Sequence, residues 1–211
     1  MFEQEKKEML KACMAMKEYE LISLSGGNVA MRIDDNYLVT PSGMLYEDMT
    51  YEDICVVNKE GKLIEGIRKP TSDIDALLYI FEKMPKVNAI IHTHQPYATA
   101  IGFSNEYLPA CMVTLIDANH AKINIAPWTK SQDIGMGKLV VEYAGDATAV
   151  IMKHHGVVSY GKDLHEALCS AVYLEEGAKT YCMARIMGDV PELSQEEIDG
   201  ELYGYQNDYG Q

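Results

Sequence analysis

The stretch AIIHTHQPYA, residues 89–98, decides how the chain is expected to fold. Its apolar beginning is typical of a buried strand, and we predict one over residues 88–93. The run ends in His92 and His94, and residues two apart on a strand point to the same face. Two imidazoles on one face can bind one metal ion, although ordinary surface histidines would show the same spacing.

A second pair of histidines, His154 and His155, follows a strand predicted at residues 147–152. Strands that end at one edge of a sheet can bring their terminal side chains together, and the glycine after this pair permits a sharp turn. A catalytic zinc site typically has three protein ligands and an open position, so this pair is the obvious source of a third ligand. Asp73, at a predicted helix start, and Asp117, after a predicted strand, are acidic candidates.

The rest of the chain alternates between helical and strand-like patterns. Helices are expected over residues 1–20, 74–84, 131–144, 163–187 and 194–204, and further strands over 29–33, 37–39, 54–57, 112–116, 123–125 and 157–159. Hairpin groups of strands with helices between them indicate an α/β or α+β layered domain. No repeat, low-complexity tract or linker divides the chain, so we expect one domain.

Three turns have the composition of anion-binding loops. They are SGGN at 25–28, TPSG at 40–43 and PTSD at 70–73, and they combine small hydroxyl or amide side chains with little bulk. Thr71 and Ser72 also stand at a predicted helix start, where unpaired N–H groups and the helix dipole favour an anion. No GxxxxGK[ST] pattern is present. These loops would therefore bind a phosphate together, or serve only as turns and helix caps.

The overall composition and charge limit the classes of binding partner that we expect. The chain has 211 residues and a net charge of −14, which argues against nucleic acid but not against a small anionic substrate. No run approaches the ~20 apolar residues of a membrane span, and the charged N-terminus lacks the apolar core of a signal peptide. Five scattered cysteines without CxxC spacing are typical of reduced thiols. We therefore expect a cytoplasmic protein with no membrane partner.

Seven motifs occur in order along nearly the whole chain. They are SGGNVAMR, VTPSGMLYEDMT, KPTSD, IIHTHQPYATA, IAPW, MKHHGVVSYGKDLHEAL and PELSQEEI. Together they resemble the class II aldolase and adducin head-domain family. The resemblance implies a three-layer α/β fold over residues 1–211, with a central, mostly antiparallel sheet flanked by helices. It also implies a homotetramer with active sites between subunits, and a C-terminal tail of about residues 200–211 reaching the active site.

The resemblance also implies roles for individual residues. A divalent metal, usually zinc, would be held by His92, His94 and His155, and not by His154. The residues implied for the substrate phosphate are Asn28, Ser42, Gly43, Thr71 and Ser72. The expected cofactor is therefore one Zn²⁺, or another divalent ion, per subunit, and the expected partner is a small phosphorylated sugar.

Two branches of the family fit different parts of the chain. Fuculose-phosphate aldolases carry a glutamate at the position of Asp73, whereas pentose-phosphate epimerases carry an aspartate there. Asp117 falls where the epimerase's catalytic aspartate would lie, and Tyr209 matches a tail tyrosine that either enzyme uses. Other features resemble the aldolase instead. They are QPYATA, IAPW, the lack of a tryptophan in the SGGNVAMR loop, and the short segment before HHG.

We therefore expect a metal-dependent aldolase that cleaves L-fuculose 1-phosphate, or a related ketose 1-phosphate, reversibly to dihydroxyacetone phosphate and an aldehyde. The expected path is a metal-stabilised enediolate. Asp73 would be the acid/base, Tyr209 from a neighbouring chain would serve the departing aldehyde, and Asp117 would be a second proton-transfer group. The alternatives are an L-ribulose-5-phosphate 4-epimerase that works by retro-aldol and aldol steps, and a non-catalytic, adducin-like interaction domain.

Overall fold

The computed structural model describes residues 1–208, and its centre is one nine-stranded sheet. The strand order across the sheet is β4-β3-β2-β1-β5-β9-β8-β7-β6. In chain order the strands are β1 (Asn28–Ile33), β2 (Asn36–Val39), β3 (Cys55–Val57), β4 (Leu63–Glu65), β5 (Ala89–Thr93), β6 (Tyr107–Leu108), β7 (Ile123–Ala126), β8 (Ala149–Met152) and β9 (Gly156–Gly161). Neighbouring strands pair antiparallel, apart from β7 beside β8. The histidine strand, β5, therefore lies in the middle of the sheet.

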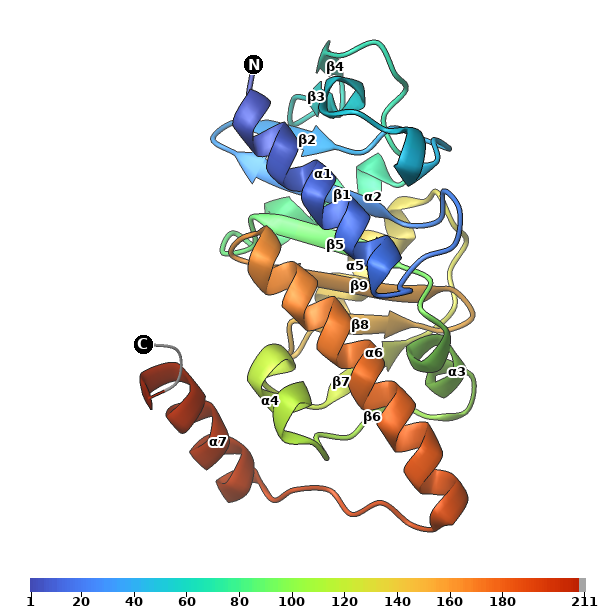
Figure 1. Cartoon of the computed structure of the whole chain (residues 1–211), viewed down its shortest axis with the longest axis vertical. Helices are drawn as coiled ribbons and strands as arrows, with labels where there is room; N and C mark the ends of the chain where they lie inside the picture. The colour runs from blue at the N-terminus through green and yellow to red at the C-terminus, as the bar shows by residue number, and fades with distance from the viewer. Residues whose placement is uncertain (209–211) are drawn as a thin grey trace.

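Helices cover both faces of this sheet. They are α1 (Glu3–Glu18), α2 (Ile74–Lys83), α3 (Pro96–Ser104), α4 (Val113–Asn119), α5 (Ile134–Tyr143), α6 (Leu164–Met187) and α7 (Gln195–Asp208), with 3₁₀ turns at Tyr46–Asp48 and Tyr51–Asp53. Helices α1 and α6 cross one face, whereas α2 and α5 pack against the other (Figure 1). The predicted three-layer α/β arrangement is confirmed. Within residues 1–208, none of the helices is long and apolar enough to cross a membrane.

The alternation of side chains along β5 determines which of them face each layer of helices. Ile90 packs in the core under α2 and α5, and Ile91 packs in the core under α1 and α6. His92 follows Ile90 by two positions, so it faces the α2 and α5 side. On the neighbouring strand β1, Asn28 is the direct partner of His92. The strand register therefore places a buried amide beside a buried imidazole.

Helix α2 is held by a narrow apolar stripe. Leu77, Ile80 and Phe81 are fully or almost fully buried on the side that faces the sheet. Each of these side chains contributes roughly 1.5–3 kcal/mol when it leaves water. The helix begins directly after Asp73, so this packing also fixes where Asp73 lies above the sheet.

Residues 112–116, predicted as a strand, instead lead into and form the first part of helix α4. Leu115 packs with Leu174 of α6 in one core, and the helix ends at His120 in a left-handed conformation. A short apolar run suits a strand or a buried helical segment equally well, and packing against α6 selects the helix. Asp117 consequently lies on a helix and not at a strand end.

One further α-helix and two strands were not predicted. Helix α3 begins at Pro96, whose missing N–H costs nothing in the first turn of a helix. The strands β4 and β6 contain only three and two residues. Such short segments lie at the two edges of the sheet and have no room for a visible alternation of polar and apolar residues.

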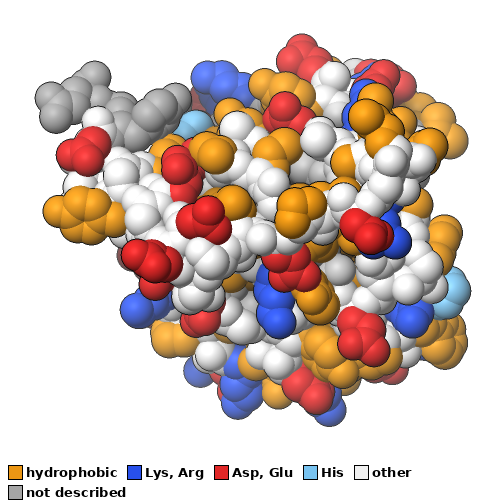
Figure 2. All heavy atoms as spheres, turned by 90° about the horizontal axis from the view of Figure 1, so that it is seen from below, with side chains coloured by type: hydrophobic (Ala, Val, Ile, Leu, Met, Phe, Trp, Pro, Cys, Tyr) orange, Lys and Arg blue, Asp and Glu red, His pale blue; other side chains and the backbone are white. Residues whose placement is uncertain are grey.

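Helix α7 packs on the outside of α4. Ala110, Ile116 and Ile198 form a small buried cluster between them. Figure 2 views the molecule from below Figure 1 and shows acidic side chains scattered among hydrophobic ones. The first turn of α7 itself carries Glu196 and Glu197. On this face, therefore, the acidic side chains are spread out rather than gathered at one site.

Candidate metal centre and its cavity

Three histidines meet at one end of the central strands. His92 is on β5, His94 lies just beyond its end, and His155 is in the turn between β8 and β9. One nitrogen of each ring lies within 4.8 Å of the other two, and the ring centroids are 4.8 to 5.3 Å apart. Within residues 1–208, no other group of His, Cys, Asp and Glu side chains has metal-binding spacing. The structure thus brings together the histidines that the family resemblance implied.

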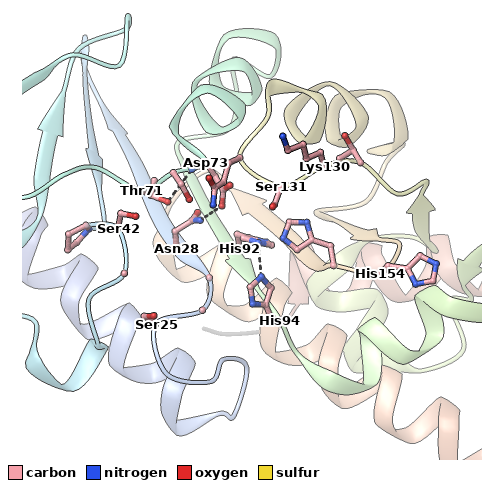
Figure 3. Close-up of a pocket in the computed structure, with 18 of the residues that line it drawn as sticks. Ser25, Asn28, Ser42, Thr71, Asp73, His92, His94, Lys130, Ser131 and His154 are labelled. Carbon is pink, nitrogen blue, oxygen red and sulfur yellow. Dashed lines mark hydrogen bonds between the residues drawn. The ribbon is translucent and has the colours of Figure 1, made fainter.

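His154 is adjacent in sequence but not part of this cluster. Its backbone is left-handed, with φ at 59°, and its ring lies against that of Phe103, tilted by 30° with the centroids 5.2 Å apart. Figure 3 shows His154 turned away from His92 and His94. Because the left-handed backbone separates the two successive side chains, only the second histidine of HHG reaches the cluster.

His92 is oriented by a hydrogen bond on its far side. Its Nδ1 lies 2.8 Å from the backbone oxygen of Val157, and a carbonyl oxygen can only accept, so Nδ1 donates. The lone pair of Nε2 is then free to face the cluster. This Nε2 lies 3.2 Å from Nε2 of His94. Two nitrogens that bind a tetrahedral zinc at 2.0–2.1 Å are separated by about 3.3 Å.

The electrostatic environment keeps these imidazoles neutral. Burial, together with His155 and His94, lowers the pKa of His92 to about 3. Burial likewise lowers the pKa of His94 and of His155, and the Asp73 carboxylate partly offsets both shifts. A metal binds the deprotonated ring. Three neutral nitrogens that point to one position fit a divalent ion. Zinc is one such ion, and the same three donors suit other divalent metals.

Two glycines allow the backbone to close around the cluster. A Cβ on Gly156 would overlap the backbone oxygen of Thr93, and one on Gly27 would overlap that of His92. Gly27 also has a left-handed backbone, with φ at 81°. Any side chain at either position would push the HHG turn or the SGGN loop away from β5.

Asp73 faces the cluster and not its own helix. It occupies the N-cap position of α2 but makes no side-chain cap bond. Its Oδ2 instead accepts a hydrogen bond of 2.8 Å from Nδ2 of Asn28, and the residue is 8% exposed. Oδ1 of Asn28 is buried and has no hydrogen-bond partner within residues 1–208. A carboxylate and an amide oxygen are therefore available to a ligand.

A cavity of about 460 Å³ opens over the histidines. The predicted phosphate residues all line it, namely Asn28, Ser42, Gly43, Thr71 and Ser72, as do Asp73 and the three clustered histidines. Two of the loops are joined by backbone hydrogen bonds. The Ser42 amide donates to the backbone oxygen of Lys69, and the Thr71 amide donates to the backbone oxygen of Thr40. In the described part of the chain, the amides of Gly43 and Ser72 have no hydrogen-bond partner. They are free to donate to an anion.

One predicted catalytic residue that the structure describes is not in this cavity. Asp117 on α4 is not among the lining residues, and burial together with Glu201 of α7 raises the pKa of its carboxyl group. Tyr209 lies outside the described residues. The described part of the predicted tail, residues 200–208, belongs to α7, and none of it lines the cavity of its own chain.

One wall of the cavity was missed by the sequence-based prediction. It is formed by residues 128–132, which connect β7 to α5. Lys130 is the one Lys or Arg among the lining residues, and it makes no ion pair within residues 1–208. Figure 3 shows it across the cavity from Ser42. The polar run TKSQ directly after the strand-end IAPW was the available signal.

Comparison with known proteins identifies the family of this chain. Residues 7–182 match the family model described as Class II Aldolase and Adducin N-terminal domain. The chain belongs to this family. Class II aldolases depend on a divalent metal, and the cluster of three histidines provides a place that could bind one.

Several solved structures have the same fold. An L-fuculose 1-phosphate aldolase superposes with a TM-score of 0.90 at 25% identity, covering 95% of each chain. YgbL from Escherichia coli, a putative aldolase/epimerase/decarboxylase, gives 0.82 at 23% identity, covering 95% of this chain and 98% of that one. The l-fuculose-1-phosphate aldolase from Thermus thermophilus gives 0.76 at 22%, covering 87% and 95%. The aldolases of this family are lyases, so the family match indicates an enzyme of this type.

Proposed function

We propose that this protein is a metal-dependent aldehyde-lyase that cleaves L-fuculose 1-phosphate, or a related ketose 1-phosphate, reversibly to dihydroxyacetone phosphate and an aldehyde. One observation carries the proposal: the histidine cluster and the anion-type loops line the same cavity. A ketose 1-phosphate needs both, because its phosphate lies a few atoms from the carbonyl that must be polarised. The 25% identity with an L-fuculose 1-phosphate aldolase over 95% of each chain supports this choice.

His92, His94 and His155 would hold one Zn²⁺ or another divalent ion. Bound there, the ion would supply Lewis acidity, which polarises the carbonyl and stabilises the negative charge that develops as the C–C bond breaks. Neutral imidazoles suit this task because they leave most of the ion's positive charge in place. The Val157 carbonyl would keep His92 in the tautomer that presents Nε2.

Asn28, Ser42, Gly43, Thr71 and Ser72 would bind the substrate phosphate. The amides of Gly43 and Ser72 are unpaired in the described chain, and the start of α2 adds the positive end of a helix dipole. The two loops are tied to each other by backbone hydrogen bonds, so little ordering is needed when the phosphate arrives.

Asp73 would be the acid/base group. It is buried, held by Asn28, and near enough to His94 and His155 to change the pKa of both. It would exchange a proton with the substrate carbon from which the aldehyde departs. Tyr209 of a neighbouring chain would exchange the proton of the hydroxyl that becomes the aldehyde oxygen.

We further propose a cytoplasmic homotetramer with active sites between subunits. Support for the shared active sites comes from helix α7, which packs on α4 through Ile198 and Leu202 and does not line the cavity of its own chain. A tail that carries Tyr209 would then serve a neighbour's cavity.

An L-ribulose-5-phosphate 4-epimerase is the second candidate, and Asp73 favours it. An aspartate stands where the aldolases carry a glutamate. Asp117, which does not line the cavity of its own chain, would be a second proton-transfer group in the cavity of a neighbouring chain. The same C–C bond would break, but the aldehyde would turn within the site and be attacked on its other face instead of leaving.

The deciding experiment incubates the zinc-loaded protein with L-fuculose 1-phosphate and with L-ribulose 5-phosphate in parallel. Release of dihydroxyacetone phosphate from the first supports the aldolase. Conversion of the second to xylulose 5-phosphate, with no free aldehyde, would replace it by the epimerase. A non-catalytic, adducin-like domain would show neither reaction and no stoichiometric metal, and His92→Ala would then change nothing.

A further inference from the structure

Helix α6 carries a buried carboxylate that the proposed reaction does not use. Glu175 lies in the middle of this helix and is 9% exposed. Burying a carboxylate is costly unless its oxygens accept hydrogen bonds. Burial does raise its pKa, while bonds from the amides of Ala98 and Tyr97 oppose the shift. The partners of Glu175 therefore show what it contributes to the fold.

Both oxygens of Glu175 accept hydrogen bonds from the first turn of α3. Oε1 lies 2.8 Å from the amide nitrogen of Tyr97, and Oε2 lies 3.0 Å from that of Ala98. These two amides are among the donors that a helix start leaves unpaired, and Pro96 before them has no N–H. A residue far away in sequence thus caps α3 in place of the residue at its own N-cap position.

That N-cap residue, Gln95, has a different partner. It makes no cap bond with its side chain, which is fully buried. Its Nε2 donates to the backbone oxygen of Ala171 on α6 at 3.2 Å, and its Oε1 accepts from Oγ1 of Thr93 at 2.5 Å. Gln95 and Glu175 therefore attach the same short segment to the same face of α6.

His94 directly precedes this segment. Thr93 and Gln95 flank His94 in sequence and point toward α6, whereas His92 and His94 point into the cavity on the opposite side. His94 lies beyond the last ladder pair of β5, which is Thr93 with Val157, and its side chain has a single hydrogen-bond partner, His92, within residues 1–208. The backbone at His94 is consequently fixed from the α6 side, through its neighbours Thr93 and Gln95.

We propose that Glu175, with Gln95, is a positioning residue that sets the place of His94 for metal binding. The proposal rests on the proposed metal site. Glu175 fixes the first turn of α3, and Gln95, directly before that turn, is bonded to α6. Together they would restrict His94 to one position relative to His92. Preorganised ligands bind a metal more tightly than ligands that must be ordered, and losing such a support typically costs 10–100-fold in affinity.

Zinc affinity of the full-length protein tests this directly. Glu175→Gln keeps the shape of the side chain but offers only one oxygen to two amides. Its neighbour on the same helix is exposed, so Glu176→Gln is the matched control. Competition with a chromophoric chelator should give a zinc Kd raised about tenfold or more for Glu175→Gln and unchanged for Glu176→Gln. Urea unfolding of the metal-free proteins measures stability separately.

A double-variant cycle separates positioning from general destabilisation. If Glu175 acts through His94, then Glu175→Gln has no further effect on the zinc Kd once His94→Ala is present. An unchanged Kd in Glu175→Gln, with only a lower free energy of unfolding, would overturn the proposal, as would an equal loss of affinity in the His94→Ala background. Should Glu175→Gln fail to fold, Thr93→Val removes the hydroxyl bond to Gln95 at nearly constant volume and should also raise the Kd.

The outcome is distinguishable from failure of the proposed function. A wild-type protein that binds no zinc would overturn the metal site together with this proposal. A wild-type protein that binds zinc but cleaves neither sugar phosphate would remove only the proposed reaction, and the affinity cycle would still decide the role of Glu175.

Discussion

The side-chain amide of Asn28 donates a hydrogen bond of 2.8 Å to the carboxylate of Asp73. The two residues are 45 positions apart, on strand β1 and at the start of helix α2. The bond holds a buried carboxylate toward the histidine cluster at a position where an aspartate would ordinarily cap its own helix. We regard this relationship as the main structural support for a catalytic role of Asp73.

Asp73→Asn should reduce kcat by about 10²–10⁴-fold, because an amide cannot exchange the proton that a carboxylate can. The fold should survive, since the replaced side chain makes no cap bond in α2. Steady-state rates and thermal unfolding of the same preparation measure both effects. Asp75→Asn, at an exposed position in the same helix turn, is the control and should keep full activity. Unchanged kcat in Asp73→Asn would remove the acid/base role.

Lys130→Ala should raise KM for a phosphorylated sugar and leave kcat nearly unchanged. The ammonium group is the one cationic side chain among the described residues that line the cavity, so its loss weakens attraction of an anionic substrate. A loss of about 1 kcal/mol, the interaction of two unit charges about 4 Å apart in bulk water, corresponds to roughly a fivefold change. Lys130→Arg keeps the charge, and Lys59→Ala removes one that does not line this cavity. A KM equal to that of wild type in Lys130→Ala would make this lysine a solvated side chain.

Gly156→Ala should destabilise the protein strongly, by more than about 3 kcal/mol, because the added Cβ meets the Thr93 carbonyl on the neighbouring strand. Gly200→Ala is the matched control: it lies in helix α7, and no atom lies within 4 Å of its added Cβ. There the change should stabilise by roughly 0.5–1 kcal/mol through helix propensity. Urea titration gives both values. Equal stability of the two variants would show that β9 can move away from β5.

Asp117→Asn should make the protein more stable at pH 7.5 but not at pH 4. Burial and Glu201 raise the pKa of this carboxyl above its ordinary value of 3.8. Between that value and the raised one, the folded protein holds a proton that the unfolded chain has lost, so stability falls as the pH rises through this interval. An asparagine removes this penalty.

Thermal midpoints at the two pH values measure the difference. Asp146→Asn, at an exposed position in the turn before β8, should show no such pH-dependent gain. A gain for Asp117→Asn that is as large at pH 4 as at pH 7.5 would contradict the titration and indicate a packing effect instead.

Several features of the site were readable from local patterns. The apolar run before His92 predicted a buried strand, and strand periodicity put His92 and His94 on one face. Turn residues marked the loops at 25–28, 40–43 and 70–73, and the structure places all three around one cavity. These inferences succeed because backbone periodicity and turn conformation depend on neighbouring residues.

Other features required the folded chain. The run at 112–116 suited a strand or a helix until packing against α6 selected the helix. Residue patterns alone did not choose between His154 and His155, which the left-handed backbone at His154 separates. That Lys130 lines the cavity could be seen only in the folded chain, where its loop lies opposite Ser42. The role of Glu175 likewise depends on its hydrogen bonds to α3.

By itself, therefore, the sequence determined the types of the main elements, the shared face of two histidines and the chemical character of three loops. The tertiary structure decided that His155 joins them, that Asp73 turns from its helix toward the cavity, and that Asp117 faces Glu201. The physical reason is the range of the interactions. Periodicity and turns arise within a few residues, whereas strand register and helix packing join positions that are tens of residues apart and become defined only when the whole core assembles.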